Sequence, residues 1–272
     1  MKCSIDFKGA TGYYRSFGKG PVVMLVHGFI EEGAMWDTTA KALQKNYKVL
    51  VPDLPGFGAS PLAKGHLPLS MELYAEYLLA ILKQEKVKKL VLLGHSMGGY
   101  IALYFAEKYG SMLAGFGLVN SHCFEDSAQK KINRKKGIAF VKQHGTRVFV
   151  TELYNSIFHE SFKKKNPQNR TLIKKLVAQA LKYSPEAIMA ANAAMMHRED
   201  KSEVLKNATV PVLFINGKDD ESAPIAYTLK QAAYPKIADI HFFSNCKHMC
   251  VFERRRETIA AINGFCGLAW HF

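Results

Sequence analysis

The sequence predicts an α/β protein with a mostly parallel, doubly wound sheet and an inserted helical segment. Short apolar runs alternate with segments of helical periodicity up to residue 121. The alternation stops over residues 122–206 and resumes over residues 207–272. Strand–helix alternation places successive strands parallel, with helices on both faces of the sheet. We therefore expect one core built from residues 1–121 and 207–272, interrupted by a helical insertion.

The first part of the chain supplies strands in a regular order. Residues 4–17 alternate as a strand pair does, with a turn at residues 8–12. The continuous apolar run at residues 21–26 is typical of a strand buried on both faces. Ser70 is a candidate N-cap for the helix that follows it. Further strands are expected at residues 47–51 (ending at Pro52), 89–93 and 116–120, and further helices at residues 36–43 and 100–109.

The insertion differs from the core in pattern and in charge. Residues 122–206 contain helical patterns and no convincing strand. They hold 17 Lys or Arg against 8 Asp or Glu, so +9 of the net charge of +14 lies there. After the insertion, strands are expected at residues 210–215 and 239–243, and helices at residues 223–233 and 256–265.

Composition favours a globular enzyme that works in a reducing compartment. The 272 residues, 48% of them hydrophobic, suit one large α/β domain or a domain with an insertion. No apolar run approaches the roughly 20 residues that span a bilayer, and the N-terminus shows no signal-peptide pattern, so we expect a cytoplasmic protein. Five scattered cysteines do not form a disulfide framework. Cys246, His248 and Cys250 lack a second cluster with zinc-site spacing, so no metal is expected.

The most informative stretch surrounds Ser96. An apolar run ends at Gly94, the serine follows two residues later, and Gly98 and Gly99 lead into a helix-like segment. A strand can reverse directly into a helix only through a strained turn, which glycines on both sides permit. Such a turn leaves the serine hydroxyl exposed. The G-x-S-x-G spacing occurs by chance in about one sequence in ten, so the other groups of a catalytic site must be found independently.

An acid and a base follow Ser96 in the order that this topology requires. A serine hydroxyl needs a base, and the base needs an orienting acid. Asp219, Asp220 and Glu221 come directly after the strand near residue 215; we favour Asp220, with Asp219 next. Alternatively, this acidic cluster caps the following helix. His248 lies after the last strand and before a helix, which makes it the best candidate base.

Two backbone N–H groups are expected to stabilise an oxyanion. The loop after the strand at residues 21–26 contains Gly28, which makes room for the Phe29 N–H to face the serine. The Met97 N–H, at the start of a helix, is the other donor. His27 is interpreted as holding its loop by hydrogen bonds, and His95 as a structural residue.

Taken together, these motifs resemble the α/β-hydrolase superfamily over nearly the whole chain. The resemblance implies that Ser96, Asp220 and His248 are catalytic and that residues 122–206 form a helical cap. It also implies hydrolysis of a small carboxylic ester through an acyl-enzyme, without cofactor or metal. The chain looks most like small capped serine hydrolases such as carboxylesterases, proline iminopeptidases and carbon–carbon bond hydrolases. The matching residues are His27-Gly28-Phe29 with Trp36, residues 53–60, residues 94–99, residues 217–220 with Pro224, and His248.

Several alternatives remain open at this stage. Ser96 stands where epoxide hydrolases and haloalkane dehalogenases of this fold place an aspartate, which favours acyl chemistry. A carbon–carbon bond hydrolase, a lyase, a cofactor-free oxidative enzyme or a low-turnover ligand-binding protein would also fit the fold. The expected partner is a small ester, with no nucleic acid and no membrane. The basic cap suggests an acidic carrier protein, or it is simply a solvated basic surface.

Overall fold

The computed structural model describes residues 1–272 and contains one sheet of eight strands in the order β1-β2-β4-β3-β5-β6-β7-β8. The six strands from β4 to β8 in this order run parallel to one another, whereas β2 pairs antiparallel with β4, and β1 antiparallel with β2. This arrangement confirms the predicted mostly parallel sheet. The strands are β1 Lys2–Phe7, β2 Ala10–Phe17, β3 Val22–Val26, β4 Lys48–Asp53, β5 Leu90–His95, β6 Leu113–Val119, β7 Val212–Gly217 and β8 Ala238–Phe243.

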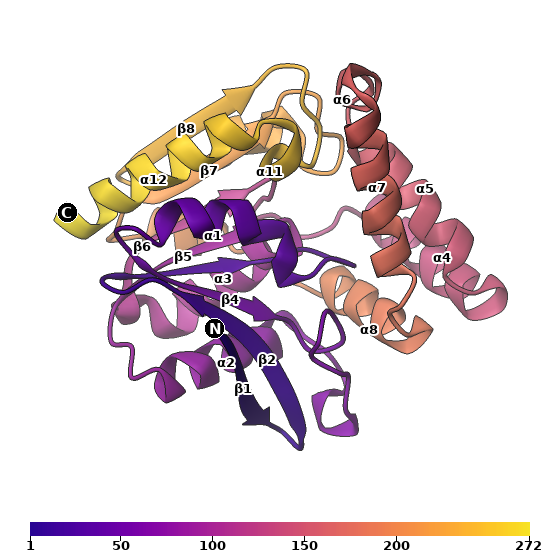
Figure 1. Ribbon diagram of the computed structural model, residues 1–272, viewed down its shortest axis with the longest axis horizontal. Coiled ribbons are helices and arrows are strands. Elements are labelled where there is room, and N and C mark those ends of the chain that lie inside the picture. Colours follow the sequence, from indigo (N-terminus) through magenta and orange to yellow (C-terminus); the bar gives the residue numbers. More distant parts are fainter.

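Helices cover both faces of the sheet, as Figure 1 shows. One apolar cluster joins α1 and α12 to one face, and a larger cluster joins α2 and α3 to the other. No helix combines the length and the apolar character that crossing a bilayer demands. The helices of the core are α1 Asp37–Leu43, α2 Met71–Gln84, α3 Met97–Tyr109, α10 Ile225–Gln231, α11 Cys250–Glu253 and α12 Arg255–His271, with short 3-10 helices at Gly33–Trp36, Lys64–His66 and Gly110–Met112.

The segment between β6 and β7 consists of helices and the loops that connect them, and contains no strand. Because β6 and β7 are themselves paired, this long insertion leaves the sheet uninterrupted. Its longer helices gather beside the sheet, beyond the ends toward which the parallel strands point (Figure 1). The helices of the insertion are α4 Ala128–His144, α5 Arg147–Ile157, α6 Glu160–Lys165, α7 Pro167–Ala180, α8 Pro185–Met196 and α9 Ser202–Lys206.

The expectation that Pro52 ends its strand was wrong, because β4 continues to Asp53. Pro52 lies opposite Tyr14 of β2. On the other side, β4 pairs with β3 only as far as Leu50. Beyond that point one side of β4 has no strand partner, so the missing N–H of proline is tolerated there.

Two helix boundaries also differ from the prediction. Helix α3 begins at Met97 rather than Tyr100, because the turn at Ser96 passes directly into helical backbone despite the two glycines. Helix α12 continues past Phe265 to His271, and the short helix α11 was not anticipated. The predicted N-cap is present, since the Ser70 hydroxyl accepts a hydrogen bond from the Leu73 N–H at 3.0 Å.

Candidate active site

Ser96 occupies a strained turn between β5 and α3. Its φ angle is 50°, a left-handed conformation that is uncommon for a non-glycine residue. Two bonds hold the turn: the Ser96 N–H donates to the Val119 carbonyl at 2.9 Å, and the Ser121 hydroxyl donates to the Ser96 carbonyl at 2.8 Å. The strained backbone is therefore fixed from the neighbouring strand, and the hydroxyl reaches the cavity.

The glycines around Ser96 are required by close backbone approach. A Cβ at Gly94 would lie 2.0 Å from the Gly98 carbonyl oxygen. A Cβ at Gly98 would lie 2.5 Å from the Val26 carbonyl oxygen of β3. Both contacts are with backbone atoms that cannot move aside, so the G-x-S-x-G spacing is a steric requirement of this turn.

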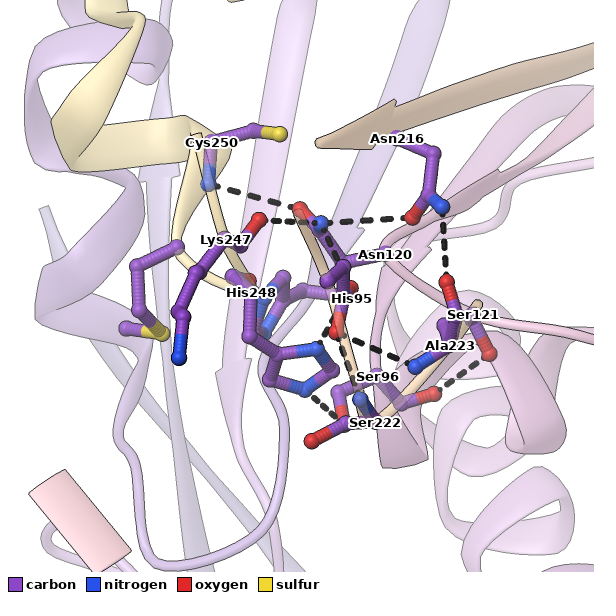
Figure 2. A network of polar contacts seen from close by, with 12 residues as sticks. His95, Ser96, Asn120, Ser121, Asn216, Ser222, Ala223, Lys247, His248 and Cys250 are labelled. Atoms are coloured by element: carbon purple, nitrogen blue, oxygen red, sulfur yellow. Dashed lines mark hydrogen bonds and ion pairs between the residues drawn. The ribbon is translucent and has the colours of Figure 1, made fainter. Parts of the chain in front are cut away.

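The structure brings Ser96, His248 and Asp220 into one hydrogen-bonded chain (Figure 2). His248 Nε2 lies 2.8 Å from Ser96 Oγ, and His248 Nδ1 lies 2.8 Å from Asp220 Oδ2. The side chains come from loops after β5, β7 and β8, which end at the same edge of the sheet. With Nδ1–H donated to the carboxylate, Nε2 is free to accept the serine proton.

Asp220 is held as a buried carboxylate. Its Oδ1 accepts the N–H groups of Ser222 (2.8 Å) and Ala223 (3.1 Å), just before α10. Burial alone would raise the pKa of Asp220, but the charge and hydrogen bond of His248 and the backbone donors bring it below its ordinary value. These bonds hold the turn before α10, but the helix itself has Pro224 as its N-cap and no side-chain capping bond, so the alternative that the acidic cluster caps this helix is wrong.

The neighbouring acids lie elsewhere. Asp219 Oδ2 accepts the Cys246 N–H at 3.2 Å and lies 3.8 Å from His159 Nε2. Glu221 is exposed and pairs with Lys247 at 3.0 Å. Neither contacts His248, so the geometry favours Asp220 among the three sequence candidates.

Sequence reasoning missed Asn120, which connects the loop that carries Asp220 to the loop that carries His248. Its backbone has a φ of 49°, and its side-chain amide donates to Asp220 Oδ2 at 2.9 Å and to the Lys247 carbonyl at 3.1 Å (Figure 2). Its Oδ1 accepts the Cys250 N–H at 3.3 Å. An asparagine just after a strand is too common a signal to identify this role in advance.

The two expected oxyanion donors, the N–H groups of Phe29 and Met97, lie on two different segments next to Ser96. Phe29 lies in the loop after β3 and lines the same cavity as Ser96. Met97 is the first residue of α3, so its N–H has no acceptor within that helix. Gly28 permits the close approach of this loop, since a Cβ there would lie 3.1 Å from Ser96 Cβ. Both N–H groups thus belong to segments that adjoin the serine.

The loop after β3 also carries a buried ion pair that sequence reasoning missed. Glu31 Oε2 accepts the Gly28 N–H at 2.6 Å and lies 3.0 Å from His95 Nδ1. The other ring nitrogen of His95 lies 2.8 Å from the backbone carbonyl of His248. Carboxylate and carbonyl oxygens only accept hydrogen bonds, so both His95 nitrogens must carry a proton and the ring is an imidazolium.

The pKa shifts of this pair agree with that assignment. Burial opposes the charge on His95, but Glu31 and the His248 carbonyl raise its pKa above the ordinary value. Burial likewise opposes the charge on Glu31, while His95 and the Gly28 N–H lower its pKa. The structural role expected for His95 is thus specific, because it connects the loop after β3 to the backbone of His248.

His27 holds its loop by hydrogen bonds, as the sequence suggested. Its Nε2 accepts the Leu54 N–H at 2.9 Å, and its Nδ1 lies 2.8 Å from the Gly28 carbonyl. Burial lowers the pKa of His27, which agrees with a neutral ring that donates through one nitrogen and accepts through the other.

A cavity of about 330 Å³ opens onto Ser96. The part of the cavity formed by the core is lined by Phe29, Glu31, Tyr100, Ser222 and His248, and the other part is lined by residues of α4, α5 and α8. The five cysteines are free, and no group of three or more His, Cys, Asp or Glu side chains is placed to hold a metal ion.

Comparison with known proteins places this chain in a family. The model of the α/β-hydrolase fold matches residues 21–254, so the chain belongs to the α/β-hydrolase fold family. This match confirms both the resemblance and the fold class that the sequence predicted. The serine–histidine–aspartate arrangement described above is built on that family's topology.

Individual relatives include esterases. A pimeloyl-[acyl-carrier protein] methyl ester esterase of Vibrio atlanticus is 29% identical over 220 residues, covering 79% of this chain and 82% of that protein. The structure of a thermophilic esterase from Thermogutta terrifontis, solved with malate bound, superposes with a TM-score of 0.90 at 28% identity and covers 99% of both chains. These comparisons agree with the expected enzyme class, an α/β-hydrolase acting on ester bonds.

Other matches are partial. The chain spans about a third of the length of three uncharacterised mycobacterial relatives: the protein from Mycobacterium bovis is 29% identical over 121 residues, which is 43% of this chain and 35% of that protein.

Proposed function

We propose that this protein hydrolyses small carboxylic esters through an acyl-enzyme on Ser96. The observation that carries the proposal is the chain of 2.8 Å contacts from Asp220 through His248 to a strained serine. Acyl transfer uses this arrangement: a pre-positioned nucleophile contacts a histidine, and a buried acid orients that histidine. The esterases among the relatives support the same chemistry.

In the proposed mechanism, Ser96 Oγ attacks the ester carbonyl while His248 Nε2 takes its proton. Asp220 stabilises the resulting imidazolium. The Phe29 and Met97 N–H groups stabilise the negative charge on the former carbonyl oxygen. His248 then protonates the departing alcohol. A water molecule, deprotonated by His248, attacks the acyl–Ser96 ester and releases the carboxylic acid.

The direct test is covalent labelling with a fluorophosphonate probe. We expect the wild-type protein to be labelled and Ser96→Ala to remain unlabelled, because only the activated serine reacts with the phosphonyl group. Hydrolysis of p-nitrophenyl esters should fall about 10³-fold or more in Ser96→Ala. A wild-type protein that neither labels nor turns over these esters would favour a low-turnover binding protein instead. Rates across a series of acyl lengths would then define the depth of the pocket.

We propose residues 122–206 as a cap that decides which esters reach Ser96. Helices α4, α5 and α8 from this segment line the cavity over the serine. Its charge supports a second candidate substrate, an ester carried on an acidic carrier protein. The surplus of +9 in the segment and the Vibrio atlanticus relative, named for an acyl-carrier-protein ester, both favour this candidate.

A further inference from the structure

The wall of the cavity contributed by the insertion is rich in hydrogen-bond donors. Lys130, Asn133 and Arg134 from α4, together with Asn192 from α8, line the same cavity as Ser96. The Asn192 side-chain oxygen accepts from Arg134 at 3.0 Å, and the Asn133 oxygen accepts from Gln129 at 3.0 Å. Both amide oxygens are therefore occupied, and each amide still has N–H groups to offer.

The same wall carries positive charge that the protein does not neutralise. Asp126 is buried and is shared by two arginines, pairing with Arg134 and, at 2.7 Å, with Arg198. Lys130 has no carboxylate partner, and burial together with the charge of Arg134 lowers its pKa. Of these residues only Lys130 and Arg134 line the cavity; Asp126 and Arg198 do not. The cluster of three cations and one carboxylate carries a surplus of two positive charges.

The acids on the core side of the site do not offset this surplus. Glu31 lines the cavity, but its charge is matched by the imidazolium of His95 at 3.0 Å. Asp220 is engaged by His248 and by backbone N–H groups. A partly desolvated cavity with unmatched positive charge favours an anionic ligand, because Coulomb energies are larger where water is excluded.

The geometry points to a subsite for a carboxylate group of the substrate, formed by Lys130, Asn133 and Asn192 beside Arg134. This inference rests on the proposed ester hydrolysis and names its substrate class: esters that carry a second, ionised carboxyl group. A carboxylate fits better than a phosphate because two nitrogens of the Arg134 guanidinium, Nε and Nη1, are already engaged by Asp126 and Asn192. The ammonium and the amide N–H groups that remain match the smaller anion.

The test compares monomethyl adipate with methyl hexanoate, a neutral methyl ester of equal chain length. We expect the wild-type protein to cleave the anionic ester with the higher kcat/KM, and Lys130→Met to reduce that preference about tenfold. Lys130→Arg should retain it. Lys136→Met is the matched control, since Lys136 lies on the same helix and does not line the cavity. Adipate should inhibit the wild-type protein more strongly than inorganic phosphate.

The outcomes separate the two proposals. If methyl hexanoate is cleaved but the wild type shows no preference for the anionic ester, or if Lys130→Met behaves like Lys136→Met, the carboxylate subsite is wrong. Stronger inhibition by phosphate would also overturn the carboxylate assignment. If neither ester is cleaved and no probe labels Ser96, it is the hydrolase proposal that fails.

Discussion

At the scale of single residues, the site depends on positions where two backbone segments lie so close together that no side chain fits between them. Ser96 has a left-handed φ of 50° that only the surrounding turn enforces. Gly94 and Gly98 lie against carbonyl oxygens at distances that exclude a side chain. The strained backbone at Ser96 is therefore maintained by residues that carry no reactive group.

Replacing Gly94 by alanine should destabilise the protein by about 3 kcal/mol or more, because the new Cβ would lie 2.0 Å from the Gly98 carbonyl oxygen. Urea denaturation followed by circular dichroism measures this change. Gly264→Ala is the matched control, since Gly264 lies inside α12 with no atom near its Cβ position. That variant should be stabilised by about 0.5–1 kcal/mol. Equal effects at both glycines would contradict the steric argument.

At the scale of elements, buried hydrogen bonds connect the loops that surround Ser96. The Glu31–His95 pair connects the loop after β3 and the end of β5 to the backbone carbonyl of His248. Asn120, after β6, connects the loops that carry Asp220 and His248. Because each link joins segments far apart in the chain, the relative position of Ser96, Asp220 and His248 is set by buried hydrogen bonds between loops.

The Glu31–His95 pair predicts a pH dependence of stability. The raised pKa of His95 means that its contribution is complete below the ordinary value of 6.5 and is lost as pH rises through the folded-state pKa. The lowered pKa of Glu31 means that its contribution is complete above 4.5 and is lost as pH falls through the folded-state pKa. The pair should therefore stabilise the fold most between pH 4.5 and 6.5.

Glu31→Gln tests this expectation. Near the middle of that window the variant should lose about 3 kcal/mol of unfolding free energy, since a buried imidazolium is left without its partner. The difference from wild type should shrink at alkaline pH, where His95 can deprotonate. Chemical denaturation of both proteins across pH measures the difference. A loss that is independent of pH would indicate that the pair is not charged.

At the scale of the whole molecule, a basic helical segment lies beside the sheet, beyond the ends toward which its parallel strands point (Figure 1). The chain carries a net charge of +14, and +9 of it lies in residues 122–206. Such a field attracts acidic macromolecules and speeds their association at low salt. The wall of the cavity and the outer surface of the segment both carry this charge. A small anionic ester tests the charge of the wall, and an acidic carrier protein tests that of the outer surface.

For an ester bound to an acidic carrier protein, kcat/KM should fall about tenfold as ionic strength rises from low salt to 1 M, because the Debye length shrinks to about 3 Å. A neutral p-nitrophenyl ester is the control and should be cleaved at a rate that depends little on salt. Steady-state kinetics over a salt series measures both. Carrier-bound ester rates that do not respond to salt would exclude the carrier candidate and leave the basic surface as a solvated face.

The sequence by itself determined the order of the strands and of most helices, and it predicted Ser96, His248 and an acid from the Asp219–Glu221 cluster, with Asp220 favoured. Those features are local: an apolar run predicts a buried strand, the glycines around Ser96 predict a tight turn, and Asp220 and His248 directly follow strands. Only the tertiary structure decided what surrounds them. Glu31 and His95 are 64 residues apart, and Asp126 and Arg198 are 72 apart. The packing of distant segments determines which residues pair in this way, and a local sequence pattern contains no information about that packing.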